Sequence, residues 1–458
     1  MESHRTVSGH NVRLRRIERG YTMSRALLRV SLLAGALIWV AGCGGSSGAG
    51  SGGGNNSTTV TFTITGGTPA AVATKIGSGS FAAATLTAGK LTLSLPSGTT
   101  NFAVAFACPA VSLRPTSQAQ EAIENVFQAS TLDGTSFSQS CPTAPGTGTT
   151  GTLTGSVDAS AIPVASFLDI NAGNGTGQSS TTLGSSSGSF SLAAPAGTDR
   201  VEVAAYSSVQ VSVSNGFFET ISLVAAKSFS SQTVPGALNG GNTVVFSAAD
   251  ETTLEPLTYS SVPSGYGAPS TLVGYEMGGQ GAFLIASFAT SGYPVLPAGA
   301  TQSGDSYVFT ASAQNTSNAI ERVVVTTTSA SAVPESFAFP TAWSYAGPTP
   351  AALPSFDLSY TGFSGKTDVH NGVGMTWVTG STTENLVAVT ATENYLNGST
   401  TLAVPDLSNL TGFIAPPASG TDVVWTAEIS QGSSSSGQSS GSNGTVTTVL
   451  NTGHYKVP

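Results

Sequence analysis

Charged side chains are scarce in this sequence of 458 residues. Asp, Glu, Lys and Arg make up 9% of it, and 24 acidic residues outnumber 15 basic ones, which gives a net charge of −9 at pH 7. Binding to nucleic acid requires clustered cations that contact phosphates. The sequence therefore predicts no nucleic-acid partner, and the solubility of the chain must come from uncharged polar residues.

Histidine and cysteine are also rare, with four and three copies. His4 and His10 lie in the N-terminal segment, and His454 is expected to be exposed in the last strand. His370 lies in "KTDVHNGVG", which we interpret as a turn, although Asp368 could share a metal with it. Most metal and acid–base sites rely on His, Cys or paired carboxylates. The sequence therefore predicts no catalytic residue, no metal site and no cofactor.

One uncharged hydrophobic run stands out, from Val30 to Val40, and Arg25 and Arg29 precede it. In a helix this run would cover roughly 17 Å, whereas the hydrocarbon core of a bilayer is about 30 Å thick. The run is therefore too short to span a membrane and is typical of a signal peptide. Residues 1–22 lie upstream of Met23, which we interpret as the true start.

The hydrophobic run ends in Val40-Ala41-Gly42-Cys43, which resembles the lipobox of bacterial lipoproteins. That resemblance implies cleavage before Cys43, lipid attached to its thiol, and a membrane as partner. Gly44 is not the Asp that retains lipoproteins at the inner membrane, so the expected location is the cell envelope at the outer membrane. A plain signal peptide with a chance cysteine is the alternative. The Gly- and Ser-rich residues up to 57 are typical of a flexible tether.

Two cysteines remain in the rest of the chain, Cys108 and Cys141. In an oxidising compartment an even pair is most simply a disulfide. A metal pair is the alternative, but it would need further ligands, and no His lies within two hundred residues downstream. We therefore predict a Cys108–Cys141 disulfide.

Alternating apolar and polar residues dominate the pattern of the chain. "TVTFTIT" from Thr59, "KLTLSL" from Lys90 and "NFAVAFAC" from Asn101 each place apolar side chains on one face at a period of two, as a strand requires. Gly and Pro interrupt such runs about every ten residues, which favours an all-β fold. The one helical pattern is Ser117–Ala129, so a short helix is expected there.

An internal repeat has a spacing close to 100 residues. "LTLSLPSGTTNFAVAF" from Leu91 matches "FSLAAPAGTDRVEVAAY" from Phe190, and "VLPAGATQSGDSYVFTA" from Val295 is a looser copy. The spacing suits β-sandwich domains. The strand, Pro-x-Gly turn and second strand resemble the carboxypeptidase-regulatory or prealbumin-like modules of bacterial surface proteins. That resemblance implies tandem Ig-like or prealbumin-like sandwiches.

The tail of the chain has its own pattern, with "GVGMTWVTG" and "DVVWTAEIS". It resembles a fibronectin type III-like sandwich, which implies that Trp377 and Trp425 are core residues. We predict the following segments: a signal peptide at 1–42, a tether at 43–57, a first sandwich with the short helix at 58–148, a second sandwich at 149–228, a third β-domain at 229–346 and the fibronectin-like sandwich at 347–458.

Two hypotheses for function remain open. The first is a non-enzymatic surface lipoprotein with a binding, adhesive or scaffolding role, whose partner is a glycan or an envelope protein. The second is a lipid-anchored carbohydrate-active enzyme or carbohydrate-binding accessory protein with its site in residues 250–345. Two close carboxylates in a pocket there would favour it. Candidate ligand-binding residues of that region, with a core role as the alternative for the aromatic ones, are Tyr259, Tyr266, Glu276, Tyr293 and Trp343.

Overall fold

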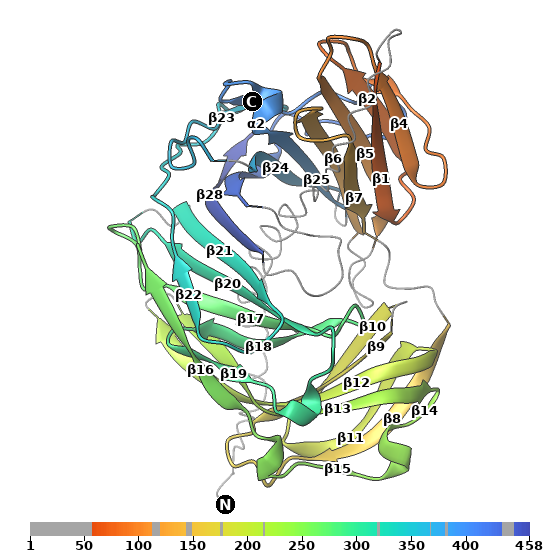
Figure 1. Ribbon diagram of the computed structural model, residues 1–458, viewed down its shortest axis with the longest axis vertical. Helices are drawn as coiled ribbons and strands as arrows, with labels where there is room; N and C mark the ends of the chain where they lie inside the picture. The colour runs from red at the N-terminus through yellow and green to blue at the C-terminus, as the bar shows by residue number, and fades with distance from the viewer. Residues whose placement is uncertain are drawn as a thin grey trace, which may run out of the picture.

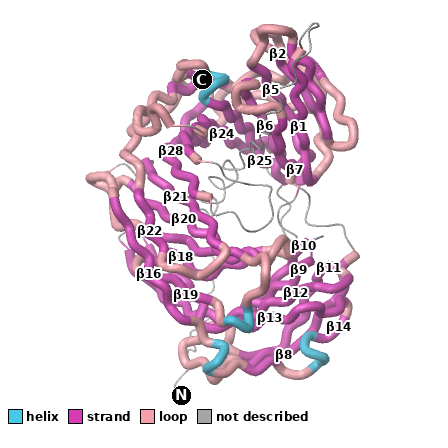
Figure 2. The backbone as a smooth tube through the Cα atoms, in the orientation of Figure 1, coloured by secondary structure: helices cyan, strands magenta, loops and turns pink. Residues whose placement is uncertain are grey.

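The computed structural model describes residues 57–111, 120–142, 149–174, 177–213, 216–317, 321–366, 368–380, 383–432 and 444–458. The predicted signal peptide, Cys43 and most of the predicted tether lie outside these residues. Within them the chain is all-β, as predicted (Figure 2). Its described helical segments are one short α-helix, α2 (Glu393–Leu396), and three 3-10 helices of three or four residues, η1 (Leu238–Gly241), η2 (Ala248–Asp250) and η3 (Ala298–Ala300). None of the described helices is long and apolar enough to cross a membrane.

The strands form four successive units. Unit 1 contains β1 (Thr58–Gly66), β2 (Ala71–Ile76), β3 (Ala82–Ala83), β4 (Lys90–Leu95), β5 (Asn101–Val111), β6 (Gln120–Ser130) and β7 (Ser136–Cys141). Unit 2 contains β8 (Thr150–Asp158), β9 (Phe167–Asn174), β10 (Gly177–Leu183), β11 (Ser187–Pro195), β12 (Gly197–Val213), β13 (Gly216–Val234), β14 (Gly236–Ala237) and β15 (Val244–Val245).

The other two units follow in the chain. Unit 3 contains β16 (Thr253–Ser260), β17 (Ser270–Glu276), β18 (Ala282–Ala289), β19 (Gly292–Val295), β20 (Ser306–Gln314), β21 (Glu321–Ser329) and β22 (Glu335–Ala338). Unit 4 contains β23 (Ser355–Asp357), β24 (Val369–Thr379), β25 (Thr383–Thr392), β26 (Thr401–Ala403), β27 (Asp422–Gln431) and β28 (Thr445–Lys456).

The four units share one strand order. In units 1 to 3 the first strand lies between the fourth strand and the seventh, in the orders β4-β1-β7, β11-β8-β14 and β19-β16-β22. It is antiparallel to the fourth strand and parallel to the seventh, and in unit 2 the short eighth strand, β15, also pairs with β8. The remaining strands of every unit form a second sheet in the order third, second, fifth, sixth. In unit 4 the described part of the small sheet is the pair β23-β26.

This order corrects one expectation for the tail. Immunoglobulin-type sandwiches place their first two strands in the same sheet, whereas β23 and β24 lie in different sheets. The fibronectin type III-like resemblance of the tail therefore does not extend to its strand order. Trp377 and Trp425 are nevertheless both buried in the core, as predicted.

The second sheets of all four units join edge to edge into one sheet of 16 strands, which curves into a C (Figure 1). Units 3 and 4 form the middle, with β21 paired to β28. Unit 2 joins unit 3 through a single pair, Ser222 with Ala286. Unit 1 joins unit 4 through the parallel pair β6 and β25. The first unit of the chain thus lies beside the last.

The small sheets of the outer units 1 and 2 and those of the middle units 3 and 4 cover opposite faces of the large sheet. Val126 of β6 packs into the core that units 3 and 4 share, while its neighbour Phe127 packs into the core of unit 1. Ala204 and Val203 of β12 divide in the same way between the shared core and the core of unit 2. Because successive residues of a strand point to opposite faces, the outer units bury both faces of their joining strands.

Two further expectations are wrong. Residues 120–129 of the predicted helix belong to strand β6, because β5 and β25 pair with its two edges and both of its faces are buried. The predicted boundary between residues 228 and 229 falls inside β13, and unit 2 continues to β15, which pairs with β8.

Candidate ligand-binding site

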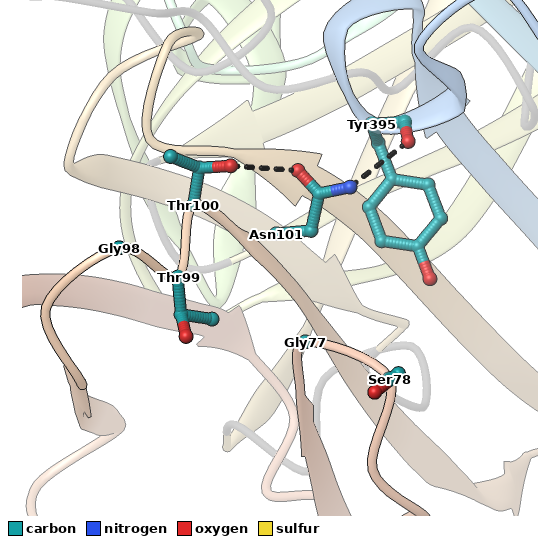
Figure 3. Close-up of a pocket in the computed structure, with 7 residues that line it drawn as sticks. All are labelled: Gly77, Ser78, Gly98, Thr99, Thr100, Asn101 and Tyr395. Carbon is teal, nitrogen blue, oxygen red and sulfur yellow. Dashed lines mark hydrogen bonds between the residues drawn. The ribbon is translucent and has the colours of Figure 1, made fainter.

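A shallow pocket of about 370 Å³ lies where units 1 and 4 meet (Figure 3). The β2–β3 loop contributes Gly77 and Ser78, the β4–β5 loop contributes Gly98 to Thr100, and Asn101 is the first residue of β5. Unit 4 contributes Tyr395 from α2, almost three hundred residues further along the chain. None of the seven lining residues is charged. This volume is at the low end of the range found for small-molecule binding sites.

The two loops of unit 1 turn sharply because of glycine. Gly77 and Gly98 have φ angles of 57° and 81°, in the left-handed region that side chains other than glycine rarely adopt. A turn in which Thr99 N donates to Pro96 O at 3.0 Å carries the chain from β4 into β5. These two glycines therefore line the pocket with backbone alone.

Asn101 holds the two units of the pocket together. Its Nδ2 donates to the carbonyl oxygen of Tyr395 at 3.1 Å, and its Oδ1 accepts from Thr100 Oγ1 at 3.2 Å (Figure 3). Both bonds fix the plane of the amide. These two bonds leave one N–H and one oxygen lone pair of the amide. The side chain can therefore donate one further hydrogen bond and accept one.

A second set of hydrogen bonds fixes α2 against unit 1. The carboxylate of Asp133, in the β6–β7 turn, accepts from Ser130 N at 2.8 Å and from Asn394 Nδ2 at 2.6 Å. It also accepts from Thr392 Oγ1, which caps α2 by accepting from Tyr395 N at 3.2 Å. The parallel register of β25 and β6 brings these groups together. Tyr395 is therefore held in place before any ligand arrives.

His370 belongs to β24 and not to a turn, so that expectation is wrong. Burial lowers the pKa of His370, with Asp133 and Asp368 raising it to a smaller extent. The imidazole is thus neutral at pH 7 and is part of the packed interior. His454 is exposed in β28, as predicted.

The candidate residues of unit 3 do not line this pocket. Tyr293 is fully buried, with its hydroxyl donating to Val333 O at 2.9 Å, and Trp343 is buried and stacked on Tyr345. Tyr259 is half-buried and stacks on Phe337. These three rings pack in or against the hydrophobic core, and none of them lines the pocket between units 1 and 4.

The two remaining candidates lie apart. Tyr266 is half-buried at the isolated bridge to Asn315. Glu276 is exposed at the end of β17, where Ser306 Oγ donates to it at 3.4 Å. The structure therefore does not bring the five candidates together into one site.

Carboxyls with raised pKa values lie at the joints between units. Burial raises the pKa of Glu124, on β6, to about 7, although Ile414 N of unit 4 donates to it at 3.0 Å. Burial likewise raises the pKa of Glu202, on β12, to about 8, against the attraction of Arg200. Both side chains are at most 2% exposed. Shifted pKa values often mark active sites, but these two groups have no access to a substrate.

The joint between units 2 and 3 is built on a buried ion pair. Arg200 donates to both oxygens of Asp305, at 2.6 and 2.9 Å, and to Ala300 O at 3.1 Å. Tyr275 Oη donates to the same carboxylate at 2.7 Å. A second pocket of about 520 Å³ lies beside this joint, where Lys227 and Asp250 form an ion pair of 3.1 Å. Charge at this joint is thus matched within the protein.

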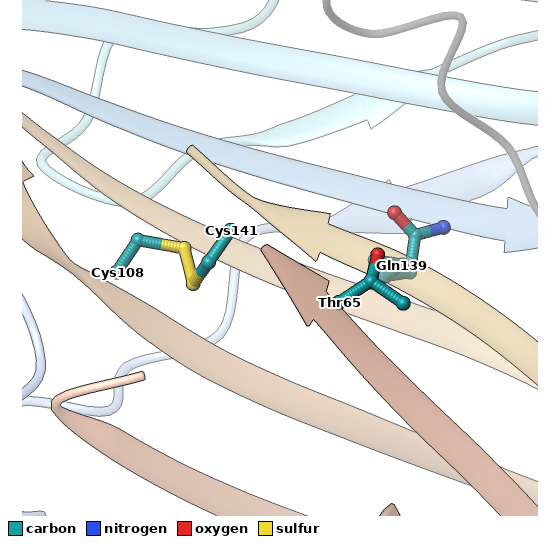
Figure 4. Close-up of a disulfide and its surroundings, with 4 residues drawn as sticks. All are labelled: Thr65, Cys108, Gln139 and Cys141. Atoms are coloured by element: carbon teal, nitrogen blue, oxygen red, sulfur yellow. A yellow bond between two sulfur atoms is a disulfide. The ribbon is translucent and has the colours of Figure 1, made fainter. Parts of the chain in front are cut away.

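Cys108 and Cys141 form the predicted disulfide (Figure 4). It ties the end of β7 to β5 across the core of unit 1. In the small sheet, Gly66 of β1 lies opposite Cys141, and Thr65 Oγ1 donates to Gln139 O at 3.3 Å. Disulfides persist in oxidising compartments outside the cytosol.

Sequence reasoning missed Asn101 and Tyr395. The turn "PSGTTN" was visible as a repeated feature, but it gave no sign that its far side meets another unit. "TATENYLN" contains the capping Thr392 and Tyr395, which are typical of a short helix start. Nothing in either segment specifies the other.

Comparison with solved structures finds a similarity to the pilus adhesin SpaC from Lactobacillus rhamnosus GG. It covers 74% of this chain and 43% of that chain at 10% identity, with a TM-score of 0.14. The chain thus corresponds to less than half of the adhesin, and so low a TM-score carries no argument about fold or function. No family model and no curated protein matches the chain.

Proposed function

We propose that this protein is a lipid-anchored, extracytoplasmic protein of the cell envelope. It binds a partner and does not catalyse a reaction. The observation that carries the proposal is the pocket between units 1 and 4. Its lining offers hydroxyls, an amide and an aromatic ring, but no acid, base or activated nucleophile. Such a lining suits recognition rather than proton transfer.

The anchor and compartment are part of the same proposal. The lipobox-like segment ending at Cys43 supports attachment to the membrane by lipid, and the tether supports a folded part held away from the surface. The Cys108–Cys141 disulfide supports an oxidising location. The proposed location is the outer membrane, and the proposed partner is an envelope protein or a glycan.

The repeated strand order supports one module type throughout. The Pro-x-Gly repeat resembles prealbumin-like modules, and the three segments that carry it occupy corresponding places in units 1, 2 and 3, between the fourth strand and the fifth. We propose that all four units are copies of this module, including the tail. Their fusion into one sheet would suit a rigid scaffold that holds the four units in a fixed arrangement around the partner site.

The test uses full-length protein labelled with palmitate in cells and then purified in detergent. We expect label on the wild type, unprocessed and unlabelled precursor for Cys43→Ser, and no turnover on ester, peptide and polysaccharide panels. Wild-type protein should bind to isolated envelopes. Label retained on Cys43→Ser would contradict the anchor. Turnover lost in Glu276→Gln would instead support a carbohydrate-active enzyme.

A further inference from the structure

From the lining of the pocket between units 1 and 4 we infer that it binds an uncharged saccharide, with Tyr395 as the stacking ring and Asn101 as the polar contact. This inference rests on the proposed binding function and names its ligand. It concerns a region of the molecule outside residues 250–345.

The absence of charge in the lining selects a neutral ligand. Anionic ligands are recognised by Arg, Lys or helix N-termini, and cationic ligands by carboxylates or aromatic cages. The seven lining residues hold no charged group. The nearby carboxylate of Asp133 is occupied beneath α2 by three donors, which were described above. An ion would therefore lose hydration in this pocket without gaining a counter-charge.

The polar groups suit a ligand rich in hydroxyls. Ser78 and Thr99 each carry a hydroxyl that can both donate and accept, and Asn101 has one amide N–H and one lone pair beyond its two internal bonds. A sugar hydroxyl likewise donates one hydrogen bond and accepts others. The internal bonds of Asn101 set the amide before binding, which reduces the entropy lost on association.

Tyr395 supplies the apolar surface that a sugar ring needs. Its side chain is half-buried and lies across the pocket from Thr99, with Gly77 and Ser78 below the two in the view (Figure 3). A pyranose has a face of C–H groups that packs on an aromatic ring, while its hydroxyls remain at the edge. Burial raises the pKa of Tyr395, so its hydroxyl stays protonated at neutral pH. The glycines let a ligand approach the backbone closely.

The pocket is open on one side, so its occupant need not be a free monosaccharide. Gly98 lies at the rim, and a side-chain carbon added there would meet no atom within 4 Å. A longer chain could therefore continue past the rim while one unit occupies the pocket. This arrangement suits a branch or an end of an envelope or surface polysaccharide.

The experiment measures binding of full-length protein to immobilised neutral oligosaccharides of glucose, galactose, mannose and N-acetylhexosamines, beside sialylated and sulfated counterparts. We expect binding to at least one neutral glycan. Tyr395→Ala should weaken it about tenfold or more, whereas Tyr395→Phe, which keeps the ring, should retain most of it. Ser78→Trp should abolish binding because the indole fills the pocket.

Controls separate occupancy of the pocket from loss of fold. Ser78 and Ser264 are both exposed loop residues, in units 1 and 3, so Ser264→Trp is the matched control and should bind like wild type. Thermal unfolding should be unchanged for both Trp variants. Binding that survives Ser78→Trp, or that prefers charged glycans, would overturn the inference. If the protein binds envelopes but no glycan, the inference of a saccharide ligand is wrong, while the proposed binding function still holds. Loss of both would contradict the two proposals together.

Discussion

At the scale of single residues, polar groups decide how the units are joined. Arg200 is only 3% exposed and donates to both carboxylate oxygens of Asp305 from the neighbouring unit. Two buried charges of opposite sign are tolerated only while each forms hydrogen bonds and an ion pair with the other. Because units 2 and 3 share only one pair of the large sheet, this contact fixes the angle between them where backbone pairing does not.

We predict that Arg200→Leu lowers the free energy of unfolding by about 3–5 kcal/mol, because Asp305 would then be buried without its counter-charge. The double variant Arg200→Leu/Asp305→Leu should lose less than the sum of the two single variants. Urea unfolding of the four proteins in a double-mutant cycle measures this coupling. Lys227→Met, which removes a more exposed ion pair with Asp250, is the control and should change stability by about 1 kcal/mol at most. Additive effects at Arg200 and Asp305 would contradict the prediction.

At the scale of elements, strand β5 of the outer unit 1 is apolar on both of its faces. In β5, Phe102, Val104 and Phe106 face the core of unit 1, while Ala105 between them faces the shared core. The small Ala side chain lets unit 4 approach closely from that face. The disulfide acts on the opposite face, where it links β5 to β7, the last strand of the small sheet.

We predict that removing the disulfide destabilises unit 1 in particular. Its two cysteines are 33 residues apart, and closing a loop of that size is worth about 3 to 4 kcal/mol in the chain-entropy estimate. Cys108→Ala/Cys141→Ala should therefore unfold at lower urea concentration than wild type, with amide exchange rising in β1 and β7 before it rises in unit 3. Mass tagging of both thiols in unreduced envelope protein would contradict the bond itself.

At the scale of the whole molecule, two of the joints between units contain a carboxyl that is buried as an acid. Glu124 contacts the loop of unit 4 at Ile414, and Glu202 lies beside Arg200 at the joint with unit 3. Burial raises both pKa values above the ordinary value of 4.5 for glutamate, to about 7 and about 8. The folded molecule therefore binds more protons than the unfolded chain between these limits, which links its stability to pH.

We predict that the stabilising contribution of these two carboxyls is complete below about pH 4.5 and is lost as the pH rises through 7 to 8. The sign follows because each raised pKa favours the folded state only while the acid is protonated. His370, whose pKa burial lowers, acts in the opposite direction in acid. Unfolding midpoints measured from pH 5 to pH 9 should therefore be compared between wild type and Glu202→Gln or Glu124→Gln. Each neutral variant should lose less stability over this range than wild type, and unchanged pH profiles would refute the assignment.

Several features could be predicted from the sequence because they depend on local pattern. The period of two in "KLTLSL" and "NFAVAFAC" specifies strands with one buried face, and those segments are β4 and most of β5. The same alternation turns Cys108 inward, where Cys141 meets it. The all-β class follows from such runs and from the turns between them. The anchor at Cys43 stays a prediction.

Only the tertiary structure decided how these elements meet. Residues 120–130 carry an ambiguous apolar pattern, and β6 is a strand because β5 and β25 lie on both of its edges. Asn101 and Tyr395 are uninformative in the sequence, yet the pairing of unit 1 with unit 4 places them in one pocket. The hydrophobic period of a strand specifies which face it buries, but every strand offers the same backbone donors and acceptors at its edge. Which edges join, and hence where the sites lie, depends on contacts hundreds of residues apart.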